Sequence, residues 1–186
     1  MKIGVLAGTF DPVHAGHITF AGAAAKQFNL DKVVFLPERR PRHKNGVSKF
    51  SDRLAMLKLA IIGEPIFEIY DTNEPYFTLV KSLPKLQSKY PKSDLVFLVG
   101  SDVGHHLTEW SDIDRYAQKA SFLVAVRSGH DGVIIKKEVL DKLPQLRLSF
   151  MLAPESAISS RQIREDRAKD GIAAVDHYIA EHRLYS

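Results

Sequence analysis

Short apolar runs rich in β-branched residues alternate with helical segments along the whole chain, and this alternation limits the fold more than any other feature. Strands separated by helices argue for a parallel sheet, because a parallel pair needs a crossover that is usually a helix. Such crossovers place helices on both faces of the sheet. The sequence therefore predicts an α/β fold with strands at Ile3–Ala7, Lys32–Leu36, Ile66–Tyr70, Leu95–Val99, Ser121–Val126 and Leu148–Leu152.

Apolar residues at helical spacing fill most of the intervals between these runs. Ser51 or Asp52 is available to cap the second helix and Thr78 the third, in which Pro84 predicts a break or a kink. No repeat, linker or low-complexity segment occurs, so residues 1–186 are expected to form a single domain. The expected helices are Ala15–Phe28, Phe50–Ile62, Thr78–Tyr90, Val133–Leu143, Ser159–Lys169 and Ala173–His182, with mixed helical character over His105–Ala120.

Composition narrows the class of protein. With 45% hydrophobic and 26% charged residues, the chain matches an ordinary soluble globular domain. The absence of cysteine excludes a disulfide framework and a cysteine-based zinc site, and it agrees with a cytoplasmic setting. Met1 and Lys2 lead straight into a strand, and no apolar run approaches the roughly 18 residues of a membrane span, so neither a signal peptide nor a membrane partner is expected. The net charge of +4 gives little support to nucleic-acid binding.

The segment Gly8–His17, GTFDPVHAGH, follows the first expected strand and has the features of a phosphate site. Gly8 and Thr9 come at the carboxyl end of that strand, where ligands of open α/β sheets collect and a missing Cβ lets a ligand approach the backbone. The free N–H groups of the next helix N-terminus favour an anion at the same place. His14 and His17 are three residues apart, so both rings lie on one side of the helix start and can donate hydrogen bonds to phosphoryl oxygens.

Two other interpretations of His14 and His17 stay open on the HxxH spacing alone. The rings could cap the helix or lie at the surface. They could also bind a metal ion, although the chain has no cysteine and no third or fourth ligand lies nearby in the sequence.

A cluster of cations follows the second expected strand, in the segment Pro37–Gly46, PERRPRHKNG. The cluster suggests a local anion site more than a long polyanion track, and a solvated basic loop is the alternative. Because this segment and Gly8–His17 both follow carboxyl ends of strands, the two can meet at one edge of the sheet. The cations are Arg39, Arg40, Arg42, His43 and Lys44.

A second anion site is indicated by Ile158–Arg164, ISSRQIR, at the start of the penultimate helix. Ser159 and Ser160 supply hydroxyl groups beside free N–H groups, and Arg164 supplies charge. Plain helix capping is the alternative for the two serines.

The strand, the GTFDP turn and HAGH together resemble the signature of the nucleotidyltransferase superfamily, which implies a Rossmann-like parallel sheet, the HIGH-type nucleotidyltransferase fold. Within the superfamily the chain is most similar to the bacterial-type nicotinate-nucleotide adenylyltransferases, along essentially its whole length. The matching segments are GTFDPVHAGH, LPERRPRHK, FSDRLAMLKLAI, VGSD followed by LTEW, ISSRQIR and the terminal YIAEHRLY. This resemblance implies transfer of the adenylyl group of ATP to nicotinate mononucleotide, with release of pyrophosphate, in NAD biosynthesis.

The resemblance also implies roles for the two anion segments. His14 and His17 would hold the ATP phosphates and stabilise developing charge, and Arg164 would grip the β- and γ-phosphates. Asp102 would accept hydrogen bonds from the ribose; an N-cap is its alternative. Mg²⁺ would arrive with ATP, without a named protein ligand. The implied catalytic residues are His14, His17 and Arg164, and the implied ATP-binding residues are Gly8, Thr9, Phe10, His14, His17, Gly100, Asp102, Ser159, Ser160 and Arg164.

On the acceptor side, the resemblance implies that His43 and Lys44 face the anionic groups of the mononucleotide and that Trp110 stacks on its pyridine ring. Thr78 and Arg127 are weaker candidates for the same pocket. Each has an alternative: a core tryptophan for Trp110, a helix cap for Thr78 and a surface charge for Arg127.

Departures from the family pattern bear on substrate preference. Ala7 replaces a glycine of the usual GGTFDP, Arg42 stands where a second proline often precedes the histidine, and Arg161 replaces a serine or threonine. A preference for nicotinamide mononucleotide, or dual specificity, therefore stays open.

Other functions are also weighed. Pantetheine-phosphate adenylyltransferase or cytidylyl transfer is disfavoured by Trp110 and the C-terminal pattern, and an aminoacyl-tRNA synthetase by the lack of room for an RNA-binding appendage. A regulatory nucleotide-binding module would not need His14, His17 and Arg164, which are all present. An RNA-binding module is the weakest hypothesis, because no stacking aromatics interleave the local charge. The expected partners are small molecules rather than nucleic acid, and assembly into a homo-oligomer stays open.

Overall fold

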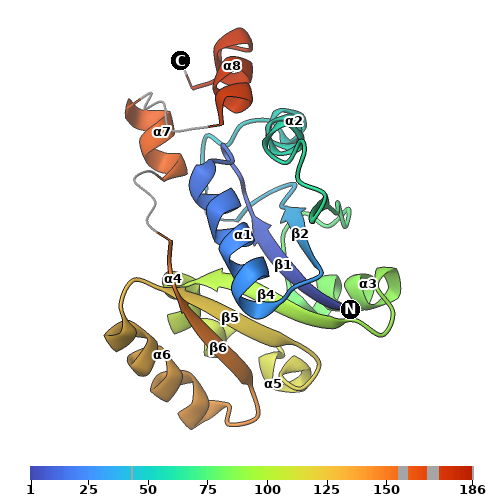
Figure 1. The fold of residues 1–186 in the computed structure, drawn as a ribbon, viewed down its shortest axis with the longest axis vertical. Helices are drawn as coiled ribbons and strands as arrows, with labels where there is room; N and C mark the ends of the chain where they lie inside the picture. The colour runs from blue at the N-terminus through green and yellow to red at the C-terminus, as the bar shows by residue number, and fades with distance from the viewer. Residues whose placement is uncertain (43, 155–158, 167–171, 186) are drawn as a thin grey trace.

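The computed structural model describes residues 1–42, 44–154, 159–166 and 172–185. These residues form one six-stranded sheet in the order β3-β2-β1-β4-β5-β6, and every neighbouring pair is parallel (Figure 1). The strand order is that of doubly wound nucleotide-binding sheets, which confirms the predicted Rossmann-like arrangement. The strands are β1 (Lys2–Gly8), β2 (Lys32–Pro37), β3 (Phe67–Ile69), β4 (Asp94–Gly100), β5 (Ser121–Val126) and β6 (Arg147–Leu152).

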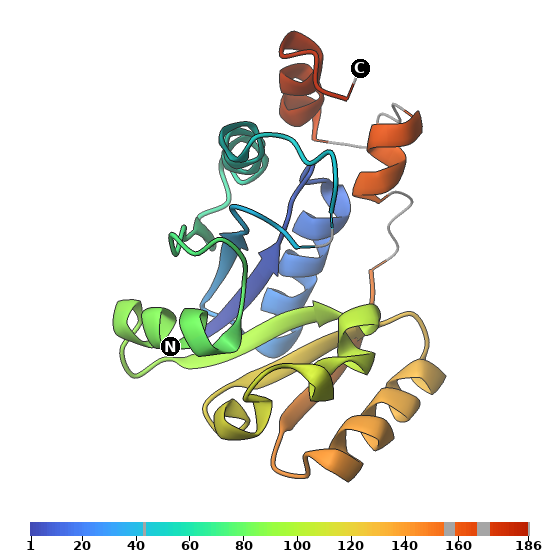
Figure 2. The same ribbon diagram turned by 180° about the vertical axis from the view of Figure 1, so that it is seen from behind.

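Helices cover both faces of this sheet, as predicted. One hydrophobic core packs α3, α5 and α6 against one face, and a second packs α1 and α2 against the other (Figures 1 and 2). α8 lies beyond the strand ends and adds Val175 to the second core by packing on α2. Ile3 and Val5 of β1 belong to the first core and Leu6 to the second, as expected where a strand is buried on both faces. The helices are α1 (Ala15–Phe28), α2 (Phe50–Ala60), α3 (Leu79–Lys89), α4 (Ser101–His105), a 3₁₀ turn η1 (Leu107–Glu109), α5 (Ile113–Tyr116), α6 (Gly129–Lys142), α7 (Ser160–Asp166) and α8 (Ala173–Glu181).

The site is positioned by the point at which the strand order reverses. β1 pairs with β2 on one side and with β4 on the other, so the connections after β1 and β4 diverge and leave a crevice beyond their carboxyl ends. In the described part of the chain, none of the helices has the length and apolar character needed to cross a membrane.

Three helix predictions need correction. The N-cap of α2 is Lys49, which makes no side-chain capping bond, rather than Ser51 or Asp52. α3 continues through Pro84 as one helix, because Leu83 and Leu86 on its buried face hold it to the core; the predicted break is wrong. α6 begins four residues before the predicted Val133, since its first turn carries no apolar residue and is instead capped by the Ser128 hydroxyl, which accepts from the Asp131 N–H at 3.2 Å.

The segment with mixed helical character, residues 105–120, contains the end of α4, the η1 turn and α5. The remaining predicted strands and helices agree with the structure to within about two residues at the ends that are described, which is the usual uncertainty of such boundaries.

α4 and α6 are joined through one histidine. The two ring nitrogens of His105 lie 3.0 Å from an oxygen of Asp131 and 2.9 Å from an oxygen of Glu138, both on α6. The hydrogen bonds to Glu138 and then Asp131 raise the pKa of His105. Because the folded state holds this proton more tightly, the contact stabilises the fold below the ordinary histidine pKa of about 6.5, and the contribution is lost as pH rises through the raised pKa.

We therefore expect His105→Gln to lower the free energy of unfolding at about pH 6, by less than about 1 kcal/mol because the groups are partly exposed. The difference from the wild type should shrink at about pH 9. Urea unfolding at the two pH values measures this, with His130→Gln, at an exposed position of α6, as the control. An equal difference at both pH values would contradict the expected dependence on protonation.

Candidate active site

A cleft of about 1280 Å³ opens beyond the carboxyl ends of β1, β4 and β5. Its wall brings together residues that the sequence analysis placed in separate segments. His43 lies outside the described residues, and Ser159 is not part of the wall. The predicted site residues that line the cleft are Gly8, Thr9, Phe10, His14, His17, Lys44, Thr78, Gly100, Asp102, Trp110, Arg127, Ser160 and Arg164.

Phe10 shapes the turn after β1. Phe10 has a φ of 50°, in the left-handed region that is rare for an aromatic residue. Its ring packs edge-on against His17, with 5.1 Å between centroids, and against Phe35 at 5.7 Å. A Cβ on Gly8 would lie 3.0 Å from the tip of this ring. A side chain at position 8 would therefore force the Phe10 ring to shift, and it would also hinder the approach of a ligand to the backbone.

His14 and His17 lie together at the start of α1. His14 is the N-cap, its backbone N–H donates to Nδ1 of His17 at 3.3 Å, and the two ring centroids are 3.8 Å apart. The predicted placement of both rings on one side of the helix start is thus seen in the structure. The capping interpretation is also partly correct, because His17 accepts from the N-cap backbone.

The protonation state of His17 follows from this environment. Burial of the ring is the largest cause that lowers the pKa of His17 to about 3, and the nearby His14 and Lys44 lower it further, so the ring is neutral at neutral pH. Because Nδ1 accepts a hydrogen bond, the single ring proton of the neutral form is on Nε2. His17 can therefore donate one hydrogen bond from Nε2 to a phosphoryl oxygen without carrying a charge of its own.

Thr9 connects the turn to the loop after β2. Lys44 Nζ donates to Thr9 Oγ1 at 2.9 Å, and this hydroxyl donates in turn to Glu38 at 3.4 Å. The other carboxylate oxygen of Glu38 accepts from the backbone N–H of Phe77 at 3.0 Å. Glu38 thus joins three loops at the cleft. Its role was not predicted, because an isolated glutamate in a basic loop gives no local signal in the sequence.

A buried arginine holds the same loops from behind. Arg53 of α2 is only 1% exposed, and its guanidinium donates to four backbone carbonyl oxygens. The partners are the carbonyls of Thr9 at 2.6 Å, Glu38 at 2.8 Å, Ser48 at 3.1 Å and Arg39 at 3.2 Å. Burial lowers the pKa of this guanidinium, and the nearby Asp11 carboxylate opposes that effect.

Arg53 was also not predicted as a functional residue, although its position in the sequence carries a signal. Arg53 precedes Met56, Leu57 and Ala60 by three, four and seven residues, the spacing of the buried face of α2. A charged residue in register with core residues indicates a buried charge that must be fully hydrogen-bonded.

Asp11 is held from several directions. Its carboxylate accepts from the Tyr185 hydroxyl at 2.7 Å and from the Ser48 N–H at 3.4 Å, and its carbonyl accepts from Arg164 at 2.6 Å. Burial and the bond to Asp11 raise the pKa of Tyr185, so its hydroxyl keeps the proton that it donates. The C-terminal segment thereby reaches the turn that carries the two histidines.

α7 docks on the same turn through the second predicted anion segment. The Ser160 hydroxyl donates to the Pro12 carbonyl at 2.9 Å, next to the bond from Arg164 to Asp11. Ser159 instead pairs with Gln162. The backbone N–H and the hydroxyl of Ser159 both donate to Oε1 of Gln162, each at 2.9 Å. The capping alternative therefore describes Ser159, while Ser160 and Arg164 line the cleft.

An aromatic wall, formed by Phe77 and Trp110, lines another part of the cleft. The Trp110 ring packs against Phe77 at 5.6 Å and Phe122 at 5.9 Å between centroids, and it lines the cleft while touching the core. Thr78 is the N-cap of α3, as predicted, and its hydroxyl accepts from the Lys81 N–H at 3.4 Å. The same residue also lines the cleft. Arg127 follows β5 and is exposed.

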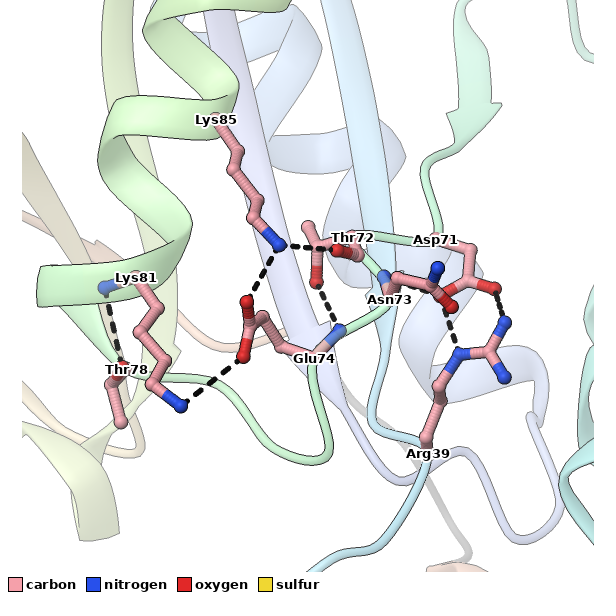
Figure 3. A network of polar contacts seen from close by, with 8 residues as sticks. All are labelled: Arg39, Asp71, Thr72, Asn73, Glu74, Thr78, Lys81 and Lys85. Carbon is pink, nitrogen blue, oxygen red and sulfur yellow. Dashed lines mark hydrogen bonds and ion pairs between the residues drawn. The ribbon is translucent and has the colours of Figure 1, made fainter.

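A network of ion pairs fixes the loop that precedes Thr78 (Figure 3). Arg39 pairs with Asp71, and Lys85 of α3 donates to the Thr72 carbonyl at 2.8 Å and to Glu74 at 2.6 Å. These contacts tie residues 71–77 both to α3 and to the loop after β2, so the aromatic wall has a defined position relative to the basic loop.

Gly100 and Asp102 form the edge of the cleft at the end of β4. Gly100 is the N-cap of α4, which excludes the N-cap alternative for Asp102. A Cβ on Gly100 would lie 2.6 Å from a carboxylate oxygen of Asp102, so glycine lets this exposed carboxylate lie against the strand end.

Comparison with known proteins gives the family. The family model described as Cytidylyltransferase-like matches residues 5–166. A protein of Synechococcus sp. (strain JA-3-3Ab) named "Probable nicotinate-nucleotide adenylyltransferase" is 36% identical, over 99% of this chain and 94% of its own. A protein of the same name from Tropheryma whipplei (strain Twist) is 37% identical, over 97% of each chain.

Solved structures share the fold. The Plasmodium falciparum nicotinic acid mononucleotide adenylyltransferase complexed with NaAD aligns with a TM-score of 0.78 at 19% identity, covering 99% of this chain and 97% of that one. A putative nicotinate-nucleotide adenylyltransferase from Vibrio parahaemolyticus aligns with a TM-score of 0.68 at 16% identity, covering 100% and 96%. The sequence relatives, which exceed 30% identity over nearly the whole chain, show that it belongs to the nicotinate-nucleotide adenylyltransferase family, within the cytidylyltransferase-like group.

Proposed function

We propose that this chain transfers the adenylyl group of ATP to nicotinate mononucleotide, forming nicotinate adenine dinucleotide and pyrophosphate. The observation that carries the proposal is the cleft itself, which is lined by both the paired histidines and Trp110. Family membership supplies the reaction, and the cleft supplies a place where both substrates could lie side by side. The proposed role in NAD biosynthesis follows from the product.

In the proposed reaction, a phosphate oxygen of the mononucleotide attacks the α-phosphorus of ATP in line. A new P–O bond joins the two nucleotides as the bond from the α-phosphorus to the bridging oxygen breaks, and pyrophosphate leaves with that oxygen. No covalent enzyme intermediate is formed. Such a reaction depends on positioning and on stabilising charge more than on a protein nucleophile.

The roles of the cleft residues follow this requirement. His17 donates from Nε2 to a phosphoryl oxygen, and His14 lies beside it at the helix start, where the backbone N–H groups also favour an anion. Arg164 and Ser160 face the β- and γ-phosphates, while Lys44, beside Thr9, faces the mononucleotide phosphate. Asp102 accepts from the adenosine ribose, and Trp110 stacks on the pyridine ring.

Mg²⁺ is proposed to enter as part of the substrate, MgATP. Among the residues that the structure describes, His, Asp and Glu side chains form no group of three that could hold a metal ion. Mg²⁺ is commonly bound through substrate phosphates with few protein ligands, which fits a cleft of this kind. The cytoplasmic setting and any homo-oligomer stay predictions.

Pyrophosphate release tests the proposed function directly. The purified chain is incubated with MgATP and, in separate reactions, nicotinate mononucleotide, nicotinamide mononucleotide or phosphopantetheine. We expect release with the nicotinate substrate. The ratio of kcat/KM for the two pyridine substrates decides between acid preference, amide preference and dual specificity.

A result with phosphopantetheine alone would move the assignment to another acceptor. Absence of release with all three acceptors, from a chain that still binds ATP, would support a non-catalytic nucleotide-binding module instead. His17→Ala serves as the control for release that does not depend on the cleft.

A further inference from the structure

Arg42 is a cation of the cleft wall that none of the roles above uses. It lies in the loop between β2 and α2, and its guanidinium carbon is 4.1 Å from the centroid of the Tyr76 ring. Arginine stacks in this way on aromatic faces, which fixes the plane of the guanidinium and leaves its N–H edges available. Within the described part of the chain, the ion pairs found include Arg39 and Arg161 but not Arg42.

The position of Arg42 places this charge near the aromatic wall. Tyr76 immediately precedes Phe77, whose ring packs against Trp110. The Arg40 N–H donates to the Pro75 carbonyl, so the basic loop and the loop that carries Tyr76 are joined by a backbone hydrogen bond next to Arg42. The ion pairs of Figure 3 hold that second loop to α3. The loop that carries Arg42 and the loop that carries its stacking partner Tyr76 are therefore held together.

Lys44, only two residues later, serves a different part of the cleft. Its Nζ donates to Thr9 Oγ1 at 2.9 Å, on the turn that carries the histidines. One loop thus supplies two positive charges to the cleft. Arg42 lies beside the aromatic wall, and Lys44 lies beside the turn that carries His14 and His17. An acceptor that presents an anion at each end matches this arrangement.

Nicotinate mononucleotide has that charge distribution, with a carboxylate on the pyridine ring and a phosphate on the ribose. We propose that Arg42 is a specificity-determining residue that pairs with the ring carboxylate, and so favours the acid over the amide acceptor. This inference rests on the proposed function. Nicotinamide mononucleotide has the same phosphate but an uncharged carboxamide, so it would gain from Lys44 and not from the charge of Arg42.

The test compares kcat/KM for the two acceptors at saturating MgATP, in the full chain and in Arg42→Gln. We expect the variant to reduce the ratio of acid to amide kcat/KM about tenfold, mainly through the KM of the acid, because one charge-assisted hydrogen bond is lost. Arg42→Lys should retain part of the preference. Arg40→Gln is the matched control, since Arg40 belongs to the same loop and is exposed but does not line the cleft; its ratio should equal that of the wild type.

Other outcomes overturn the proposal. A similar loss for both acceptors would mean that Arg42 contacts the phosphate that they share, and an unchanged ratio would mean that it contacts neither. Failure of the proposed function would appear already in the wild type, as absence of turnover. In that case quenching of the single tryptophan, Trp110, by each mononucleotide still measures binding, and equal binding of acid and amide in wild type and Arg42→Gln would also reject the role of Arg42.

Discussion

Replacing His17 with alanine is expected to reduce kcat about 10²- to 10³-fold, which is the usual effect of removing one preorganised donor from a developing charge. The loss should appear in kcat more than in KM if the hydrogen bond from Nε2 strengthens as the new bond forms at phosphorus. Pyrophosphate release at saturating MgATP and nicotinate mononucleotide measures it. Because the pKa of His17 is about 3, the donor is present throughout the neutral range.

Two variants sharpen this experiment. His17→Gln keeps an amide N–H near the position of Nε2 and should recover part of the lost activity, whereas His130→Ala, at an exposed position of α6, should behave like the wild type. The pH dependence of kcat/KM should not contain a step near pH 6.5 that His17→Gln removes, because a group with this pKa does not titrate there. A kcat for His17→Ala within threefold of the wild type, by contrast with the expected loss of about 10², would show that the ring does not act on the phosphates.

Replacing Arg53 with methionine is expected to lower the free energy of unfolding by about 3–5 kcal/mol, a large part of the 5–15 kcal/mol that is typical of a domain. The reason is the four carbonyl oxygens that would lose their donor inside the protein, each at a cost of about 1–3 kcal/mol when no water can replace it. Partial relaxation of the loops reduces the sum. Urea unfolding, followed by the fluorescence of Trp110, measures the change in midpoint.

The control and the milder variant separate burial from charge. Arg115→Met removes an exposed guanidinium and should change the stability by no more than about 0.5 kcal/mol. Arg53→Lys keeps a charge but cannot reach four acceptors at once, so we expect an intermediate loss. An unfolding midpoint of Arg53→Met equal to that of Arg115→Met would contradict the assigned role of the buried guanidinium.

The strands were well predicted from the sequence because their physical signal is local. Runs such as Val33–Leu36 and Leu95–Leu98 are buried on both faces of the sheet, so each forms a continuous apolar segment in the sequence. The start of α6 was missed for the complementary reason. Its first turn is fixed by the cap at Ser128, and Gly129 and His130 give no apolar periodicity.

The site was predicted in part. The chemistry of Gly8–His17 could be argued from glycine, the helix start and the histidine pair, but the acceptor side and the assignment to one family depended on resemblance. Contacts between distant segments were not predictable from spacing. Glu38 joins Thr9 to Phe77, and Tyr185 reaches Asp11, through side chains whose partners are set by the tertiary fold alone.

Arg53 was predictable in one respect and not in another. Its register with Met56 and Leu57 is visible in the sequence, yet which carbonyls it would satisfy depends on how the loops after β1 and β2 come together. A pattern can indicate that a charge is buried, but its partners follow only from the assembled structure.

The bond between Asp11 and Tyr185 joins residues 174 positions apart, and Arg164 reaches the same turn from 153 positions away. During synthesis on the ribosome, β1 and α1 emerge before α7 and α8, and contacts of this separation can form only after the intervening chain has been made. A nascent chain that has been made as far as β6 thus has all the strands of the described sheet. It still lacks Arg164 and Tyr185, which hold the turn before His14 through Asp11. Affinity for ATP should therefore develop after the sheet has folded, when α7 and Tyr185 dock on a turn that was synthesised well before them.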